Sequence, residues 1–491
     1  MTATWSPASL DELEARLRQD LRWLNLPPKS WVPPRLAEGG RVLDVAVIGG
    51  GLCGLAALGA LKFLGVDNIR AFDRAPAGRE GPWVTYARME TLRTRKEVAG
   101  PALGLPALSF RGWFESQFGP DAFHAMHLIP RTQWMGYLVW YRRVLDLPVE
   151  NDAAVADVAL RDDGLAALTV KSADAGRQVL ARRVILATGL DGLGGPSLPP
   201  VARTIPSRFV AHAADDIDMV ALARQRVGVV GAGASAMDNA AAALEAGAAR
   251  VDIFVRRPDI PRVDKFTGIG SKGMTHGYFG LSDRVRWTLM LEGEHAQIPP
   301  PRHSVERVAR HTNAYFHLAS PIERLTEDGD SVWITTPKGE YPADFVIFAT
   351  GFGIDFARRP EFGRIAPLIR LWRDVYMPDA ADRHEGLGQT PYLGSSFEFL
   401  PRADAAPGAR AISHIHCFAY PAVPSHGKIT SGIPSISDGA QRLAQGIARS
   451  LFVEDEAAVI QAFREFTTPE LLGDEWTDAD QLPENRHAAT P

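Results

Sequence analysis

The feature that most constrains this chain is a glycine-rich turn that occurs twice, 182 residues apart. The first copy, Val45–Gly54, reads VAVIGGGLCG, and the second, Val227–Ala236, reads VGVVGAGASA. Each copy follows an apolar strand pattern and leads into an alanine-rich helical pattern, the context in which G-x-G-x-x-G or its G/A variant binds a dinucleotide. One copy alone is weak in a chain with 45 glycines, but two predict an α/β fold with two Rossmann-type dinucleotide-binding domains.

Length and composition set the class of protein. With 491 residues, 46% of them hydrophobic and 23% charged, the chain is typical of soluble globular proteins and long enough for two or three domains. The net charge of −5 and the lack of a basic stripe argue against a nucleic-acid partner. No apolar run reaches the ~18 residues of a membrane span, and the N-terminus lacks a signal-peptide pattern, so we expect a cytoplasmic protein with no membrane partner.

Local patterns divide the chain into segments, with the second dinucleotide domain inserted in the first. Leucines spaced three and four apart predict a helix over residues 9–24, with Ser9 and Glu12 as a capping box. Further patterns predict strands at Ala154–Val170, Gln178–Leu186, Ser331–Thr336 and Phe345–Phe348, and a helix from about Ser437. The predicted segments are 1–40 (helix and proline-rich linker), 41–200 (first domain, first part), 201–340 (second domain, with an irregular insertion at 260–315), 341–455 (first domain, second part) and 456–491 (C-terminal tail).

Each residue of the first turn has a physical task. Gly49 permits the tight turn, Gly51 lets the backbone approach a pyrophosphate, and Gly54 lets helix and strand pack closely. Free N–H groups and the partial positive charge at the start of the helix favour the phosphates. Asp73 ends the next strand about 20 residues beyond the last glycine, where a carboxylate accepts hydrogen bonds from both ribose hydroxyls. The first site is therefore expected to take FAD or NAD.

The second turn lacks this carboxylate. Shifting Asp73 by the repeat distance leads to Val255, which Arg256 and Arg257 follow. With no carboxylate to repel a 2′-phosphate and two guanidiniums to bind it, this site is predicted to prefer NADPH to NADH. The alternative is that both arginines only decorate a strand end. The cofactor contacts expected from the turn itself are Gly231, Gly233, Ala234 and Ser235.

Four stretches together resemble the single-component flavin-dependent monooxygenases, which comprise the flavin-containing, N-hydroxylating and Baeyer–Villiger enzymes. Two of them are the glycine-rich turns with the residues described above. The third is Glu80–Trp83 followed by Leu92–Glu97, which is similar to a Gly-Gly-x-Trp segment and a nearby Lys-Glu segment beside the flavin. The fourth, Asp344–Phe352, ends in Ala-Thr-Gly-Phe and is similar to a stretch of the N-hydroxylating branch.

The resemblance implies an NADPH-dependent FAD enzyme. NADPH reduces FAD, O2 adds to form a C4a-(hydro)peroxyflavin, and one oxygen atom passes to a small organic substrate. Further residues expected at the cofactors are Arg74, Trp83, Arg131, Gln133, Thr350, Gly351, Ser437 and Asp438. The catalytic candidates are Arg93, Lys96 and His212. A simple N-cap stays an alternative for Ser437 and Asp438, and a surface role for Arg131 and Gln133.

Differences between this sequence and the family's motifs limit the types of oxidation that we expect. His212 is present in the segment before the second turn, but Pro206 and Arg208 stand where the family has Phe and Gly. Asp215 and Asp216 replace the Trp-Pro ending of the Baeyer–Villiger version. We therefore expect oxidation of a nitrogen or sulfur atom, with Baeyer–Villiger oxidation and flavin reduction without oxygen insertion as alternatives.

Other classes of protein have less support. A disulfide reductase needs a redox cysteine pair, but Cys53 and Cys417 lie in unrelated segments. Scattered histidines without ligand spacing give no reason to expect a metal. A flavoprotein kept only as a binding module is disfavoured because both turns are intact. The expected partners are a small-molecule substrate and O2, with a homodimer as one possible assembly.

Overall fold

The computed structural model describes residues 9–172, 175–403, 407–430 and 432–481. It divides into two compact units, Met1–Ala448 and Arg449–Pro491. No helix in the described ranges is both long enough and apolar enough to cross a membrane.

The first sheet carries the first glycine-rich turn. Its strand order is β7–β4–β3–β10–β9–β8, with β21 also paired to β10. β3, β4, β7, β10 and β21 run parallel, whereas β8 and β9 form an antiparallel hairpin against the start of β10. Helix α2 (Leu52–Lys62) connects β3 to β4 and packs on both. The bounds are β3 Leu43–Ile48, β4 Ile69–Phe72, β7 Val149–Glu150, β8 Ala154–Leu160, β9 Ala166–Lys171, β10 Gly176–Leu186 and β21 Ile415–Cys417.

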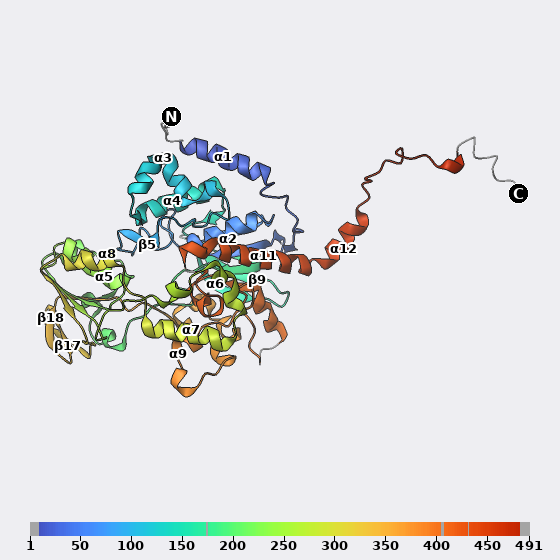
Figure 1. Ribbon diagram of the computed structural model, residues 1–491. Coiled ribbons are helices and arrows are strands. Elements are labelled where there is room, and N and C mark those ends of the chain that lie inside the picture. The colour runs from blue at the N-terminus through green and yellow to red at the C-terminus, as the bar shows by residue number, and fades with distance from the viewer. Residues whose placement is uncertain (1–8, 173–174, 404–406, 431, 482–491) are drawn as a thin grey trace, which may run out of the picture. The chain divides into compact units, whose positions relative to one another are not determined.

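The second sheet is parallel throughout and carries the second turn. Its order is β12–β19–β13–β14–β15. Helix α5 (Ala234–Glu245) connects β13 to β14 and packs on both. Figure 1 shows α5 and α8 (Arg302–Ala309) together in this part of the first unit, away from α2–α4. The bounds are β12 Val210–His212, β13 Arg226–Val230, β14 Arg250–Phe254, β15 Ala314–His317 and β19 Phe345–Phe348.

The two sheets reproduce the repeat seen in the sequence. Ile48 pairs with Phe72 in the first sheet, and Val230 pairs with Phe254 in the second, so both partners shift by the same 182 residues. The residue after Phe254 is Val255, which therefore occupies the place of Asp73. The predicted equivalence of these two positions is confirmed.

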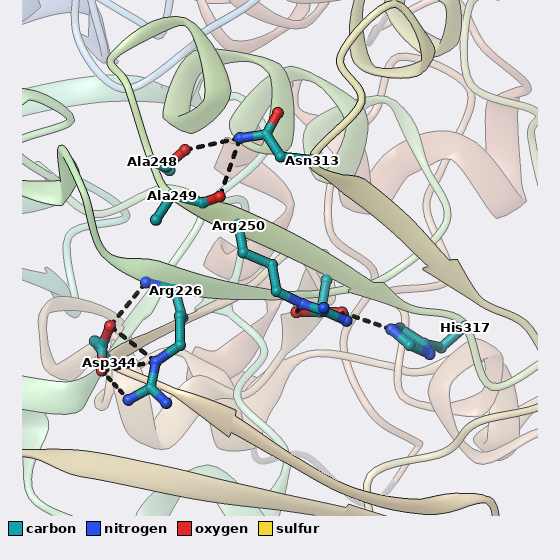
Figure 2. A network of polar contacts seen from close by, with 8 residues as sticks. Arg226, Ala248, Ala249, Arg250, Asn313, His317 and Asp344 are labelled. Carbon is teal, nitrogen blue, oxygen red and sulfur yellow. Dashed lines mark hydrogen bonds and ion pairs between the residues drawn. The ribbon is translucent and has the colours of Figure 1, made fainter.

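Polar contacts tie the strands of the second sheet at the edge opposite the turn (Figure 2). At the start of β13, Arg226 donates from its backbone N and its Nε to Asp344, which precedes β19, at 2.8 and 3.2 Å. Before β15, Asn313 donates from Nδ2 to the carbonyl groups of Ala248 and Ala249 at 2.9 and 3.3 Å. These contacts fix strand register because each joins neighbouring strands at one end.

Two strand predictions need correction. The stretch predicted as one strand over Ala154–Val170 is the β8–β9 hairpin, because a turn around Gly164 interrupts it. Ser331–Thr336 is strand β17, but it does not extend the second sheet. It lies between β16 (Arg324–Asp328) and β18 (Gly339–Ala343) in a separate antiparallel sheet. Alternation of buried and half-buried residues along β17 is typical of such a layer, and this distinguishes it from the fully buried parallel strands.

The insertion at 260–315 was predicted to be irregular, and this is wrong. It contains α6 (Lys272–Gly277), α7 (Asp283–Ala296) and α8. Ser282 caps α7 by accepting a hydrogen bond from Val285 N at 3.4 Å, and a proline run ends directly before α8. The glycines and prolines of this segment lie mostly at helix boundaries, so its composition hid the helices between them.

The helices predicted near the two ends of the chain are present. The predicted capping box of α1 (Leu10–Trp23) is confirmed, with Glu12 N donating to Ser9 Oγ at 3.3 Å and Ser9 N to Glu12 Oε2 at 3.2 Å. The helix predicted near Ser437 is α11 (Ile436–Glu454). In the second unit, α12 (Glu456–Glu465) occupies the start of the expected tail. Further elements are α3 Phe110–Ala125, α4 Arg131–Val144, α9 Glu385–Gly388, α10 Val423–His426, β1 Leu36–Ala37, β2 Gly40–Arg41, β5 Thr91–Arg95, β6 Leu128–Pro130, β11 Gly194–Pro196 and β20 Phe352–Ile354.

Candidate functional site

The first turn has two glycines that the protein itself requires. Gly49 has a φ of +109°, and a Cβ there lies 2.5 Å from the carbonyl oxygen of Ala187. A Cβ on Gly54 lies 2.0 Å from the carbonyl oxygen of Gly49. Neither contact is sterically possible, so the turn and the packing of α2 on β3 both depend on glycine.

Gly51 is different, because the protein leaves space beside it. A Cβ at this position meets nothing nearer than 3.9 Å. Gly51 is the N-cap of α2, and no side chain caps the first N–H groups of the helix there. A cavity of about 310 Å³ adjoins Gly51 and is also lined by Gly78, Glu80 and Arg142. This cradle fits a pyrophosphate group that lies against bare backbone.

Asp73 is held at the rim of this turn. One carboxylate oxygen accepts from Gly50 N at 2.7 Å, and the other accepts from Ala75 N at 2.8 Å. The side chain is buried, and each oxygen keeps a second lone pair for a ribose hydroxyl. Arg74, the next residue, points elsewhere and pairs with Asp191 at 2.7 Å.

In the second turn, as in the first, one glycine is required by the protein's own packing and another leaves open space beside the backbone. Gly231 has a φ of +140°, and a Cβ there lies 2.7 Å from the carbonyl oxygen of Ala349. A Cβ on Gly233 meets nothing within 4 Å. Gly233 is the N-cap of α5, again without a side-chain capping bond, and Ala234 and Ser235 form the first turn of the helix. A second cradle of open backbone therefore lies at the carboxyl edge of the second sheet.

The arginines expected at the second site differ in their surroundings. Val255, in the place of Asp73, is buried. Arg256 is exposed, whereas Arg257 is half-buried and donates from Nη1 to the carbonyl oxygen of His295, in α7, at 2.8 Å. A helix of the insertion thus already engages one of the two guanidiniums.

We call residues 80–103, which contain the two stretches predicted to lie beside the flavin, the flavin-side segment. Three of the expected cofactor residues lie in it or on helix α4 next to it. Arg131, at the start of α4, donates from Nη1 to the carbonyl oxygen of Trp83 at 2.5 Å. The Trp83 ring packs edge-on against Trp134 at 6.1 Å. Oε1 of Gln133 is buried and has no hydrogen-bond partner among the described residues. An unpaired buried oxygen is costly, so this atom can accept a hydrogen bond from a donor that the described residues do not supply.

Arg93 and Lys96, two of the catalytic candidates, are directed to different partners. Arg93 donates from Nη1 to the carbonyl oxygen of Pro299 at 2.7 Å, and its Nη2 lies 3.5 Å from Asp264. Lys96 Nζ donates to the last carbonyl groups of α3, at Phe123, His124 and Met126, at 2.7–2.9 Å. Lys96 therefore has a structural task at a helix end, and a catalytic role for it stays a prediction.

His212, the third candidate, lies at the end of β12 and is 2% exposed. Its Nδ1 accepts from Ala214 N at 3.0 Å, which leaves the ring proton on Nε2 in the neutral form. Nε2 makes no hydrogen bond of ordinary distance and angle in the described part of the chain, although the Gly351 backbone is close enough to interact with the ring. Burial lowers the pKa of His212 below its ordinary value, and nearby Asp215 opposes this only in part. The side chain is thus a neutral donor near Gly351, where a Cβ also meets nothing within 4 Å.

The residues expected at the cofactors in α11 and after β19 all form hydrogen bonds or ion pairs with other protein groups. Ser437 donates to the carbonyl oxygen of Gly100 at 2.7 Å and accepts from Leu103 N at 3.1 Å, so it ties α11 to the flavin-side segment. Asp438 pairs with Lys272 at 2.7 Å. Neither residue is a simple N-cap, since α11 begins at Ile436. Thr350 donates from Oγ1 to the carbonyl oxygen of Ser197.

The cysteines do not form a redox pair. Burial raises the pKa of both Cys53 and Cys417 to about 12, so neither carries a thiolate near neutral pH. Cys53 Sγ instead donates to the carbonyl oxygen of Thr430 at 3.2 Å, which joins the start of α2 to the loop before α11.

Comparisons with known proteins agree with this architecture. Residues 117–294 match the family model for L-lysine 6-monooxygenase/L-ornithine 5-monooxygenase. The chain is 37% identical over 476 residues to the FAD-dependent urate hydroxylase of Xanthomonas campestris pv. campestris, covering 96% of this chain and 99% of that protein. This chain belongs to the flavin-dependent monooxygenase family. Membership confirms that it is an oxidoreductase that uses FAD.

Solved structures show the same fold for this monooxygenase. The ornithine hydroxylase of Pseudomonas aeruginosa matches with a TM-score of 0.64 at 15% identity, covering 84% of this chain and all of that one. The ornithine N-hydroxylase of Kutzneria sp. 744, solved with reduced FAD, NADP+ and L-ornithine, matches with a TM-score of 0.61 at 18% identity, covering 83% and 99%. At these identities the likeness concerns the fold alone.

Sequence reasoning missed one residue of this monooxygenase that joins the stretch before β5 to the loop after β12 of the second sheet. Arg88 donates to four backbone carbonyl groups on both sides. No motif marks it, because three of its four partners lie more than a hundred residues away in sequence and all four are backbone atoms.

Proposed function

We propose that this monooxygenase uses NADPH to hydroxylate a carbon atom of a small planar oxo-heterocycle of the urate class. The observation that carries this proposal is the 37% identity to a urate hydroxylase over nearly the whole length of both chains. In this proposal the first sheet belongs to an FAD-binding domain, and the second sheet belongs to an NADPH-binding domain inserted in it.

The two cradles support this assignment of cofactors. At the first turn, Gly51 and the start of α2 would hold the pyrophosphate of FAD, and Asp73 would hold the adenosine ribose. At the second turn, Gly233 leaves room for the NADPH pyrophosphate. Arg256, exposed and next to a buried valine, would bind the 2′-phosphate. When bound, FAD supplies the oxygen activation.

The protein's own contribution is to bind, orient and exclude water. Arg131 fixes the backbone at Trp83, and Ser437 ties α11 to the same region. His212, neutral and buried, with no hydrogen bond of ordinary distance and angle from its Nε2–H to the described residues, is placed to donate one to a ligand at the carboxyl edge of the second sheet. A neutral donor suits this place because it adds no charge to a site that must stay dry.

Oxidation of a nitrogen or sulfur atom is the second candidate. The match of residues 117–294 to the lysine/ornithine monooxygenase model and the Asp344–Phe352 stretch favour it. The two candidates differ in substrate: a planar oxo-heterocycle in the first, a flexible amine or a thioether in the second.

One assay separates them. The FAD-loaded protein is supplied with NADPH and 18O2, and urate, L-ornithine, L-lysine and a thioether are compared as substrates. The proposal expects NADPH oxidation that depends on urate and one labelled oxygen atom in the product. Labelled hydroxylamine from an amine would support the second candidate and overturn the first.

A further inference from the structure

Arg88 joins the flavin-side segment to the second sheet. Its guanidinium donates from Nη1 to the carbonyl oxygens of Tyr86 (2.9 Å) and Ala213 (3.0 Å). Nη2 donates to the carbonyl oxygens of Asp215 (3.0 Å) and Ile217 (3.3 Å). Three of the four acceptors thus lie in the loop that follows β12. We call residues 86–90, which lead from the Trp83 region into β5, the strap.

A second arginine holds the strap from the helical insertion. Arg307, in α8, donates from Nη1 to the carbonyl oxygen of Arg88 at 3.1 Å. Its Nε and Nη2 donate to Glu245, at the end of α5, at 2.7 and 2.5 Å, and its Nε lies 3.8 Å from Glu90. Arg307 is only 10% exposed at its side chain. The strap is therefore fixed both to the loop after β12 and to the helix that starts at the second turn.

The loop that Arg88 holds also positions His212. Ala214 N donates to Nδ1 of His212, and Asp215 accepts from His212 N at 2.7 Å. Arg88 binds the carbonyl groups of Ala213 and Asp215, the residues on either side of Ala214. A shift of the strap would consequently move the loop and the His212 ring together.

We propose that Arg88 is a positioning residue that sets the distance between the nicotinamide bound at the second turn and the flavin bound at the first, and thereby the rate of hydride transfer. This inference rests on the proposed function, which places the two cofactors at these turns. Hydride transfer needs the reacting atoms in near contact, and a displacement of about 1 Å can cost roughly 100-fold in rate. A planar guanidinium can hold several carbonyl groups at fixed angles, which a lysine ammonium cannot.

The test is anaerobic stopped-flow reduction of the FAD-loaded protein by NADPH. Arg88→Gln and Arg88→Lys are compared with wild type and with Arg302→Gln, a control on α8 whose arginine is exposed and pairs only within the helix. We expect the limiting rate of flavin reduction to fall at least about tenfold in both Arg88 variants. FAD content and the Kd for NADP+ should stay within about twofold of wild type, and Arg302→Gln should be unchanged.

Several outcomes overturn the inference. One is wild-type reduction in Arg88→Gln, and another is a loss of rate that only follows a loss of bound FAD. Where Arg88→Gln does not fold, Arg307→Gln, which removes the bond to the Arg88 carbonyl, must show the slowed reduction with full FAD content. A wild-type protein whose flavin neither NADPH nor NADH reduces contradicts the proposed function itself, so the two failures are distinguishable.

Discussion

At the first turn a buried carboxylate, Asp73, follows β4, whereas at the second turn a buried valine follows β14 and two arginines come next. The backbone around both turns is the same, with equivalent strand register and one glycine in each that a Cβ would not disturb. The comparison teaches that glycine and strand pairing fix the cradle, and it is the basis of our proposal that one or two side chains at its rim select the nucleotide.

The opposite edges of the two sheets differ in another way. Asp44 of β3 lies 3.9 Å from Arg182 of β10, and both side chains are 1% exposed. The equivalent strands of the second sheet carry the pair with its charges exchanged, Arg226 on β13 and Asp344 before β19, at 38% and 27% exposure. Burial therefore raises the pKa of Asp44 to about 6 despite Arg182. Burial also acts to raise the pKa of Asp344, but the Arg226 contacts bring it below its ordinary value.

The largest expected effect concerns the third glycine of the first turn. In Gly54→Val, the new side chain would begin 2.0 Å from the Gly49 carbonyl oxygen, so the turn must move and FAD binding should be lost. At the equivalent place in the second turn, Ala236→Gly should change the free energy of unfolding by only about 1 kcal/mol and leave NADPH binding intact. Flavin content and urea unfolding are measured for both variants. Normal flavin content in Gly54→Val would contradict the claim that the first turn requires glycine at this position.

The next effect is the pH dependence of Asp44 and Asp344, the carboxylates at the equivalent edges of the two sheets. Asp44 has its folded pKa near 6, above the ordinary 3.8, so the folded protein binds the extra proton between these values. The stability that protonated Asp44 contributes is therefore lost as pH rises from about 4 to 6. The loss amounts to roughly 3 kcal/mol in the free energy of unfolding. Asp344 behaves oppositely: its lowered pKa contributes stability above the ordinary value that is lost as pH falls through the folded value.

Urea unfolding of Asp44→Asn and Asp344→Asn across pH 3–8 checks this contrast. Asp44→Asn should flatten the decline between pH 4 and 6, and Asp344→Asn should remove stability at neutral pH and flatten the acid limb. Equal pH slopes in the two variants would show that the exchanged charges are equivalent after all.

A smaller effect is expected at Val255 and Arg256, which lie at the rim of the second turn. Arg256→Ala should weaken the use of NADPH by about 1–3 kcal/mol in kcat/KM and leave NADH nearly unchanged. Val255→Asp should act in the same direction, since it restores the carboxylate that the first turn has. Steady-state kinetics with both coenzymes measure the change, and an equal loss with NADH would remove the 2′-phosphate argument.

The smallest effect separates the two arginines. Arg257 already donates to the His295 carbonyl oxygen, so it has less to offer a phosphate. Arg257→Ala should weaken the use of NADPH by about 1 kcal/mol or less in the same assay. A larger loss than in Arg256→Ala would reverse the roles given to the two residues.

The features that could be predicted from the sequence are those set by local or repeated sequence patterns. The two turns and the capping box at Ser9 depend on neighbours in sequence, and the equivalence of Asp73 and Val255 follows from the 182-residue repeat. All three are therefore visible in the pattern. The helices of the insertion were missed because their boundaries are rich in glycine and proline.

The hydrogen-bond partners of single side chains could not be predicted from the sequence, for a different reason. Lys96 closes the end of α3, and Arg88 reaches carbonyl groups 125–129 residues away. Backbone acceptors carry no sequence signature, so neither partnership leaves a pattern. The orphaned Oε1 of Gln133 and Nε2 of His212 likewise depend on burial, which only the folded chain reveals.

The most direct test of the account is titration of NADP+ into the FAD-loaded protein, followed by calorimetry and flavin absorbance together. The account predicts stoichiometric NADP+ binding with the flavin retained, and loss of that binding, but not of the flavin, in Gly233→Val. Displacement of FAD by NADP+, or unchanged binding in Gly233→Val, would contradict the claim that the two turns hold two dinucleotides at once.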